Sequence, residues 1–225
     1  MAHQLLYDFV ADLSSAIEFP GPVVEFGALQ VEEGQPNDLR PLFGGREFIG
    51  TDLRPGPGVD RVEDLLGLGF GDGEVGTALC LDTLEHCTDP LTACRELARV
   101  VADGGVCVIS SVMLIGIHAY PSDYWRFTPE GFRTLLAPFD DVDVAGFGTP
   151  EHPFFVFGVA TKGRTLGVQL AELPSLARAQ REYDQAEGKV RIGPFRLTLR
   201  ELGGTLGREL PRALRERASA RLGRR

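Results

Sequence analysis

The sequence lacks the patterns that mark several common classes of protein. No stretch of 18 residues is apolar and uncharged, so we expect no helix that spans a bilayer. The first residues lack the basic-then-apolar pattern of a secretory signal, and we expect a cytoplasmic protein. The 4 cysteines include no C-x-x-C pair. We interpret them as small buried hydrophobic residues and expect no metal site.

Two phosphate-binding motifs are also missing. The sequence has no Gly-x-Gly-x-x-Gly and no Gly-Lys-Ser/Thr, the loops that hold the phosphates of dinucleotides and nucleoside triphosphates. A nucleotide-sugar or NAD-dependent enzyme is therefore an alternative that would require a different phosphate site.

Charge is divided unevenly along the chain. Residues 1–161 hold 8 Lys+Arg and 25 Asp+Glu, a balance of −17, whereas residues 162–225 hold 15 and 7, a balance of +8. The acidic part would repel phosphates, so we expect no nucleic-acid partner for it. We predict a domain over 1–161 followed by a basic helical extension over 162–225. The extension is expected to pack on its own domain or on a second subunit of a homodimer, with a membrane surface or an acidic partner as the alternative.

Three short apolar runs predict neighbouring strands. They cover residues 23–27, 48–52 and 77–82, and each ends at a glycine or an acid. In an open α/β sheet, ligands bind beyond the carboxyl ends of the strands, where the strand order reverses. We therefore expect the residues that end these runs to gather around one crevice: Glu25, Gly27, Asp52 and Asp82.

The rest of the sequence alternates between helical and strand-like patterns. Helical spacing of apolar residues predicts helices over 4–19, 89–104, 128–138, 166–186 and 199–210, and a shorter one over 36–43. Residues 59–62 predict a short strand, and 106–112 a strand covered on both faces. Two further runs, 141–147 and 154–161, are joined by a short loop and predict an antiparallel hairpin.

These motifs carry a family resemblance. The order of Glu25-x-Gly27, the acid Asp52 and the run Leu81-Asp82-Thr83-Leu84-Glu85-His86 resembles class I S-adenosylmethionine-dependent methyltransferases. The block 123–129 resembles a segment that precedes a helix in many of these enzymes. The resemblance covers 23–161 and implies a Rossmann-like, doubly wound, mostly parallel seven-stranded α/β sheet with an antiparallel C-terminal hairpin strand. It also implies S-adenosylmethionine as the cofactor.

The resemblance implies a set of cofactor-binding residues: Glu25, Gly27, Gln30, Asp52, Leu53, Asp64, Leu65, Leu81, Asp82 and Thr83. The carboxylate of Asp52 would accept hydrogen bonds from both ribose hydroxyls. Asp64 would lie near the adenine amino group, with a helix cap or turn as its alternative role. The loop after Gly27 has fewer glycines than is usual in the family, where they let the backbone approach the ligand closely.

The irregular segment 113–127 is expected to form the acceptor side. His118, with an ordinary pKa near ~6.5, is the candidate base for the acceptor proton, and His86 is a second candidate or a structural residue. The expected substrate-binding residues are Tyr120, Asp123, Tyr124, Trp125 and Arg126. For these, aromatic packing and an Asp123–Arg126 pair are the alternatives.

Together these residues predict methyl transfer to a small molecule, with an oxygen of a sugar or secondary metabolite as the expected acceptor. A non-catalytic scaffold that binds partners through its basic tail is the alternative.

Overall fold

The structure is a computed structural model of the 225-residue chain. It describes residues 2–30, 38–118, 121–185, 190–192 and 195–197. The chain divides into two compact units, Met1–Gln180 and Arg181–Arg225. In the second unit, the strands β8 (Val190–Ile192) and β9 (Phe195–Leu197) form an antiparallel pair that the sequence analysis did not predict.

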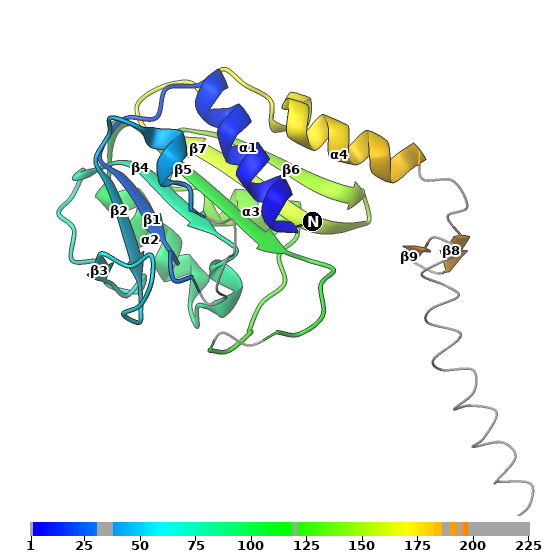
Figure 1. The fold of residues 1–225 in the computed structure, drawn as a ribbon, viewed down its shortest axis with the longest axis horizontal. Coiled ribbons are helices and arrows are strands. Elements are labelled where there is room, and N and C mark those ends of the chain that lie inside the picture. The colour runs from blue at the N-terminus through cyan, green and yellow to red at the C-terminus, as the bar shows by residue number, and fades with distance from the viewer. Residues whose placement is uncertain (1, 31–37, 119–120, 186–189, 193–194, 198–225) are drawn as a thin grey trace, which may run out of the picture. The chain divides into compact units, whose positions relative to one another are not determined.

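A single seven-stranded sheet forms the centre of the first unit (Figure 1). Its strands, in chain order, are β1 (Val23–Phe26), β2 (Phe48–Asp52), β3 (Arg61–Val62), β4 (Val75–Leu81), β5 (Val101–Val112), β6 (Asp141–Thr149) and β7 (His152–Thr161). Their spatial order is β3-β2-β1-β4-β5-β7-β6, and β7 pairs antiparallel with both β5 and β6. The predicted sheet and hairpin are confirmed. The strand order reverses between β1 and β4, where such sheets bind ligands.

Helices cover both faces of the sheet, and the strand side chains alternate between them (Figure 1). One face packs against α2 (Pro90–Val100) and α3 (Pro129–Leu135). The other packs against α1 (Ala2–Ala16), the short helices η1 (Arg40–Phe43) and η3 (Leu170–Glu172), and α4 (Pro174–Gln185). Ala78 and Cys80 of β4 face α2, whereas Leu79 and Leu81 face α1. This two-sided burial explains why β4 and β5 read as continuous apolar runs.

The starts of α2 and α3 follow the capping signals in the sequence. Asp89 accepts a hydrogen bond from the Thr92 backbone N–H at 3.1 Å, and Thr128 accepts one from Gly131 at 3.0 Å. The predicted end of α2 was wrong: the helix stops at Val100, and residues 101–105 already belong to β5. The backbone N–H of Gly104 donates to the Lys162 carbonyl at 2.7 Å instead of ending the helix. β5 therefore starts at Val101, before the strand predicted from residue 106.

The segment after Thr161 packs on the α1 face of the sheet before it becomes helical. The carboxylates of Asp141 and Asp143 accept hydrogen bonds from the backbone of Leu166 and Leu170, at 2.9 and 2.6 Å. These bonds hold an extended segment where the sequence predicted a helix from 166, and α4 begins only at Pro174. The helix expected over 199–210 lies outside the described residues. None of the described helices is both long and apolar enough to cross a membrane.

Candidate functional site

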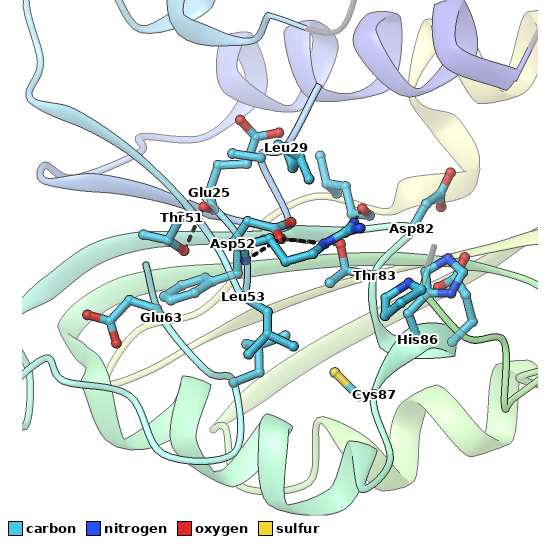
Figure 2. Close-up of a pocket in the computed structure, with 18 of the residues that line it drawn as sticks. Glu25, Leu29, Thr51, Asp52, Leu53, Glu63, Asp82, Thr83, His86 and Cys87 are labelled. Carbon is cyan, nitrogen blue, oxygen red and sulfur yellow. Dashed lines mark hydrogen bonds and ion pairs between the residues drawn. The ribbon is translucent and has the colours of Figure 1, made fainter. Parts of the chain in front are cut away.

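A cavity of about 590 Å³ opens at the carboxyl ends of β1, β2 and β4. This volume is in the range of small-molecule and cofactor sites. All ten residues expected to bind the cofactor line it: Glu25, Gly27, Gln30, Asp52, Leu53, Asp64, Leu65, Leu81, Asp82 and Thr83. In Figure 2, Asp52 and Leu53 lie on one side of this cavity and Asp82 and His86 on the other, with Thr83 between them.

Gly27, directly after β1, is a position that only glycine can occupy without strain. Its φ is +91°, and a Cβ added there would lie 2.1 Å from the hydroxyl oxygen of Thr83. Thr83 is itself fixed by a hydrogen bond to the Leu81 carbonyl at 2.8 Å. The missing side chain lets the loops after β1 and β4 approach each other at the wall of the cavity.

The glycine-poor loop after Gly27 is held against β2 and the following loop. The backbone N–H of Ala28 donates to the Thr51 carbonyl at 2.8 Å, and that of Gln30 donates to Pro57 at 3.0 Å. Ala28 is buried, and a Cβ at Gly50 would lie 3.1 Å from the Ala28 Cβ. The alanine therefore packs beside β2, where Gly50 makes room for it.

Asp52 ends β2 and points into the cavity (Figure 2). Its Oδ1 accepts a hydrogen bond from the Arg54 backbone N–H at 2.9 Å, and its side chain is 16% exposed. The same oxygen lies 3.9 Å from Arg54 Nε as an ion pair. Both contacts use Oδ1, and the carboxylate retains acceptor capacity on the cavity side.

Asp64 has a position compatible with both roles that the sequence left open, and contact with the adenine remains a prediction. It lines the cavity, and its Oδ1 also accepts a hydrogen bond from the Leu66 backbone N–H at 2.9 Å, as a turn residue does. Its neighbour Glu63, which was not predicted, lines the cavity too. Glu63 forms an ion pair with Arg61 and accepts a hydrogen bond from the Gly69 backbone N–H at 2.7 Å.

Glu25 supplies a carboxyl group with an unusual proton affinity. Burial raises its pKa to about 7, and the nearby positive charge of Arg40 opposes this shift only in part. A cation bound in the cavity would favour the charged form. The side chain is therefore suited to a positively charged ligand.

Glu85 is the residue of this site that sequence reasoning left without a role. It is fully buried in the short helix η2 (Leu84–His86), and its Oε2 accepts a hydrogen bond from Ser111 Oγ at 2.7 Å. Burial, and secondarily the charge of Asp82, raises its pKa to about 8. The sequence signal that could have identified Glu85 was its position between Asp82 and His86, both of which were expected at the site.

His86 and His118 lie together at the end of the cavity across from Asp52 (Figure 2). Their ring centroids are 5.0 Å apart, and both residues line the cavity. The Nδ1 of His86 lies 2.6 Å from the Ser122 carbonyl oxygen, and that of His118 lies 3.2 Å from the Gly116 carbonyl oxygen. The structure thus brings together two histidines that are far apart in sequence.

Asp123 and Arg126 form a clamp that closes the loop after β5. Two hydrogen bonds of 2.5 and 2.7 Å join the guanidinium to the carboxylate, and they hold the pKa of Asp123 well below its usual range. Arg126 also donates to the carbonyls of Ile115 and Gly116, each at 3.1 Å. Neither Asp123 nor Arg126 lines the cavity, so this geometry agrees with the pairing alternative.

The described aromatic residues of the same loop differ in whether they line the cavity. Tyr124 lines the cavity, whereas Trp125 lies outside it and donates from Nε1 to the Cys87 carbonyl at 2.8 Å. Tyr120 lies outside the described residues. A substrate-binding role for the four described members of the expected set remains a prediction.

The charges of the cavity fit S-adenosylmethionine better than a nucleotide phosphate. Six of its lining residues carry carboxyl groups, namely Glu25, Asp52, Glu63, Asp64, Asp82 and Glu85, against one arginine, Arg54. Phosphates would be repelled by this surface, whereas a sulfonium and an ammonium group would be attracted. Ribose hydroxyls would find acceptors among the carboxylates at the strand ends.

Comparisons with known proteins agree with the fold. A sequence model of a family described as a methyltransferase domain matches residues 47–109. Comparison with curated proteins finds none that matches this chain.

Solved structures share the fold at low sequence identity. A Thermotoga maritima protein described as a SAM-dependent methyltransferase, possible histamine N-methyltransferase, is 20% identical, with 72% of this chain and 90% of that chain covered and a TM-score of 0.52. A Pyrococcus horikoshii protein is 14% identical, with 72% and 91% covered and a TM-score of 0.54. The CurJ carbon methyltransferase is 14% identical, with 70% and 54% covered and a TM-score of 0.53.

The matched segment runs from the start of β2 into β5 and includes the strand ends that carry Asp52, Asp64 and Asp82. With the Rossmann-like sheet that the solved structures share, this match to a methyltransferase domain supports a class I S-adenosylmethionine-dependent methyltransferase, with S-adenosylmethionine as its cofactor.

Proposed function

We propose that this protein transfers the methyl group of S-adenosylmethionine to an oxygen atom of a small molecule, such as a sugar or a secondary metabolite. The observation that carries the proposal is one cavity with carboxylates at its strand-end side and two histidines at its far side. Bound S-adenosylmethionine supplies an activated methyl group, so the protein must mainly position the acceptor, exclude water and remove a proton.

The proposed cofactor side is formed by the ends of β1, β2 and β4. Asp52 would accept hydrogen bonds from the ribose hydroxyls, while Asp64 and Leu65 would lie near the adenine. Glu25 supplies negative charge for the cationic part of the cofactor. Its raised pKa supports this role, because a buried carboxyl group becomes ionised more readily beside a cation.

The proposed base is His118, with His86 as its neighbour. The Nδ1 of His118 faces the Gly116 carbonyl and lies 3.4 Å from Asp123 Oδ2, which leaves Nε2 as the nitrogen that can accept a proton. The hydroxyl proton would pass to Nε2 as the acceptor oxygen bonds to the methyl carbon and the methyl–sulfur bond breaks, which leaves the neutral, demethylated thioether of the cofactor. The Asp123 carboxylate then stabilises the imidazolium by its negative charge.

The walls near the histidines favour a compact acceptor with apolar surface. They include the side chains of Val112, Ile115, Pro121, Tyr124 and Phe155. Such a lining suits a ring or short chain that presents one hydroxyl group to the polar end. The acidity of residues 1–161 supports an acceptor without phosphates.

The first test is calorimetry with S-adenosylmethionine on the full chain. Absence of any heat at millimolar cofactor would remove the proposal. Turnover is then measured on a panel of hydroxylated small molecules. Cofactor binding without turnover on any acceptor would instead support a scaffold that binds partners through its basic tail.

With an acceptor in hand, His118→Ala should reduce turnover by roughly 10²–10⁴-fold, the usual contribution of a positioned general base. Cofactor affinity should hardly change, because Asp52, the proposed ribose ligand, lies at the other side of the cavity from the histidines (Figure 2). His152→Ala is the matched control, since His152 lies in β7 and does not line the cavity. Full turnover in His118→Ala would leave this histidine as a packing residue.

A further inference from the structure

Three potential metal ligands meet at the acceptor end of the cavity. Glu85, His86 and His118 each offer one ligand atom, and these atoms lie within 4.8 Å of one another. All three residues line the cavity, and they come from η2 and from the loop after β5. We propose that Glu85, His86 and His118 bind one divalent transition-metal ion at the acceptor end of the cavity.

The carboxyl group of Glu85 gives an independent reason to expect a ligand. The residue is fully buried, and its Oε2 is occupied by Ser111 Oγ. Its Oε1 is buried and has no hydrogen-bond partner among the described residues. A buried oxygen without a partner is costly, and a bound cation would remove that cost.

Both histidines are oriented as metal ligands usually are. A ligating histidine generally gives its second ring N–H to a carbonyl or a carboxylate, which fixes the ring and its tautomer. The Nδ1 of His86 has the Ser122 carbonyl oxygen at 2.6 Å, and that of His118 has the Gly116 carbonyl oxygen at 3.2 Å. With these Nδ1 atoms as donors, each Nε2 carries the free lone pair that a metal requires.

The ligand types indicate which ion would bind. Two imidazoles and one carboxylate suit Zn²⁺, Co²⁺, Mn²⁺ or Fe²⁺, whereas Mg²⁺ and Ca²⁺ prefer oxygen ligands. Bonds of about 2.0–2.2 Å place the ligand atoms of a tetrahedral site ~3.4 Å apart, so side-chain movements of about 1 Å for each ligand atom complete the site. Three protein ligands leave further coordination positions open, as in catalytic sites.

An ion here would change how the acceptor proton is removed, and this part of the inference rests on the proposed function. A hydroxyl bound to the ion would have a lowered pKa, lose its proton to solvent water, and present an alkoxide oxygen to the methyl carbon. His118 would then be a ligand and not a base. From the sequence we expected no metal site because the cysteines form no C-x-x-C pair, and His86 and His118 are too far apart in sequence to suggest a shared site.

The test titrates the full chain with Co²⁺ alone, without S-adenosylmethionine or acceptor, and follows the visible absorption of the ion and the calorimetric stoichiometry. We expect one equivalent to bind, and Zn²⁺ to displace it. Loss of a hydrogen-bond partner of a ligand already costs about 10–100-fold in affinity, so His86→Ala, His118→Ala and Glu85→Gln should each weaken binding by at least ~10²-fold. Thermal melting shows whether each variant is folded.

Two control variants separate this site from adventitious binding. His152→Ala removes a histidine outside the cavity, and Cys87→Ser removes the half-buried thiol that also lines it. Both should retain one equivalent of Co²⁺. Binding that survives in the three ligand variants but is lost in Cys87→Ser would overturn the inference, as would no binding at all.

The outcome is separable from that of the proposed function. Turnover that withstands a chelator, in a protein that binds no Co²⁺, would refute the metal site and leave methyl transfer with His118 as the base. Co²⁺ binding that depends on all three residues, in a protein that methylates no tested hydroxyl, would support the site while the proposed acceptor class fails.

Discussion

Replacing Asp52 by alanine should weaken S-adenosylmethionine binding strongly without unfolding the protein. Asp52 lines the cavity, and the Arg54 backbone N–H uses part of only one carboxylate oxygen. The Arg54 bond is lost in both the free and the bound variant, so it cancels in the binding free energy. The remaining acceptor capacity is available for two ribose hydroxyls.

The magnitude follows from those two hydrogen bonds. Hydrogen bonds to charged groups contribute roughly 1.5–3 kcal/mol each, so losing both costs about 3–6 kcal/mol. At 1.4 kcal/mol for each tenfold change, Kd should rise by about 10²–10⁴-fold. Asp52→Asn keeps an acceptor for the Arg54 N–H but loses the charge, so its Kd should lie between the Kd of the wild type and that of Asp52→Ala.

Calorimetry with S-adenosylmethionine and with its demethylated product measures both variants, and thermal melting without ligand reports on folding. Asp72→Ala is the matched control, because Asp72 is an exposed acid that pairs with Arg99 at 2.8 Å and does not line the cavity. An Asp52→Ala protein that melts normally and binds within about twofold of the wild type would show that this carboxylate does not hold the ribose.

Three further variants test other parts of the site. Gly27→Ala should lower the melting midpoint by about 2–8 °C, from roughly 1–2 kcal/mol of backbone strain, and should also weaken cofactor binding. Gly45→Ala is the control: Gly45 has φ +85°, but a Cβ added there would have nothing within 4 Å, so this variant should lower the melting midpoint without weakening cofactor binding. Equal cofactor affinity in the two variants would refute the close approach of Gly27 to Thr83. The pKa of Glu25 is about 7, and a bound cation favours its charged form. Cofactor affinity should therefore rise with pH through about 7 and level off above it, whereas the affinity of Glu25→Gln should depend little on pH. Calorimetry across pH checks this, and the same pH dependence of affinity in the variant would assign the effect to another group. Deleting residues 193–225 should leave cofactor affinity within a few-fold, since the proposed ligands all precede residue 161; a large loss in a truncated chain that still melts cooperatively would mean that the basic tail reaches the site.

The cofactor half of the cavity could be predicted because its residues sit at the ends of apolar runs. A strand that is buried on both faces leaves a clear sequence pattern, and the acid or glycine after it must lie at the carboxyl edge of the sheet. The positions of Asp52 and Asp82 in the cavity wall were predicted in this way. The need for glycine at position 27 is explained by its positive φ and by the closeness of Thr83.

The acceptor half was less predictable because backbone carbonyls determine its shape. Arg126 and Trp125 looked like substrate ligands by residue type, yet their donors go to the carbonyls of Ile115, Gly116 and Cys87. Such contacts depend on loop geometry, which residue identity does not encode. The same limit hid Glu85, whose proximity to His118 arises only when η2 meets the loop after β5.

The clamp between Asp123 and Arg126 closes the loop after β5 with contacts made within the loop itself. Arg126 binds the carbonyls of Ile115 and Gly116 at one end and Asp123 at the other, so the chain is closed on itself at these described residues. Closing a longer loop adds only about 0.6 kcal/mol for each doubling of its length. The segment between the clamped ends can therefore change in length or composition with little effect on the register of β5. Because His118 lies in this segment, the proposed acceptor choice would be changed through the other residues of the segment, while the strand ends that carry Asp52 and Asp82 keep their own sequence.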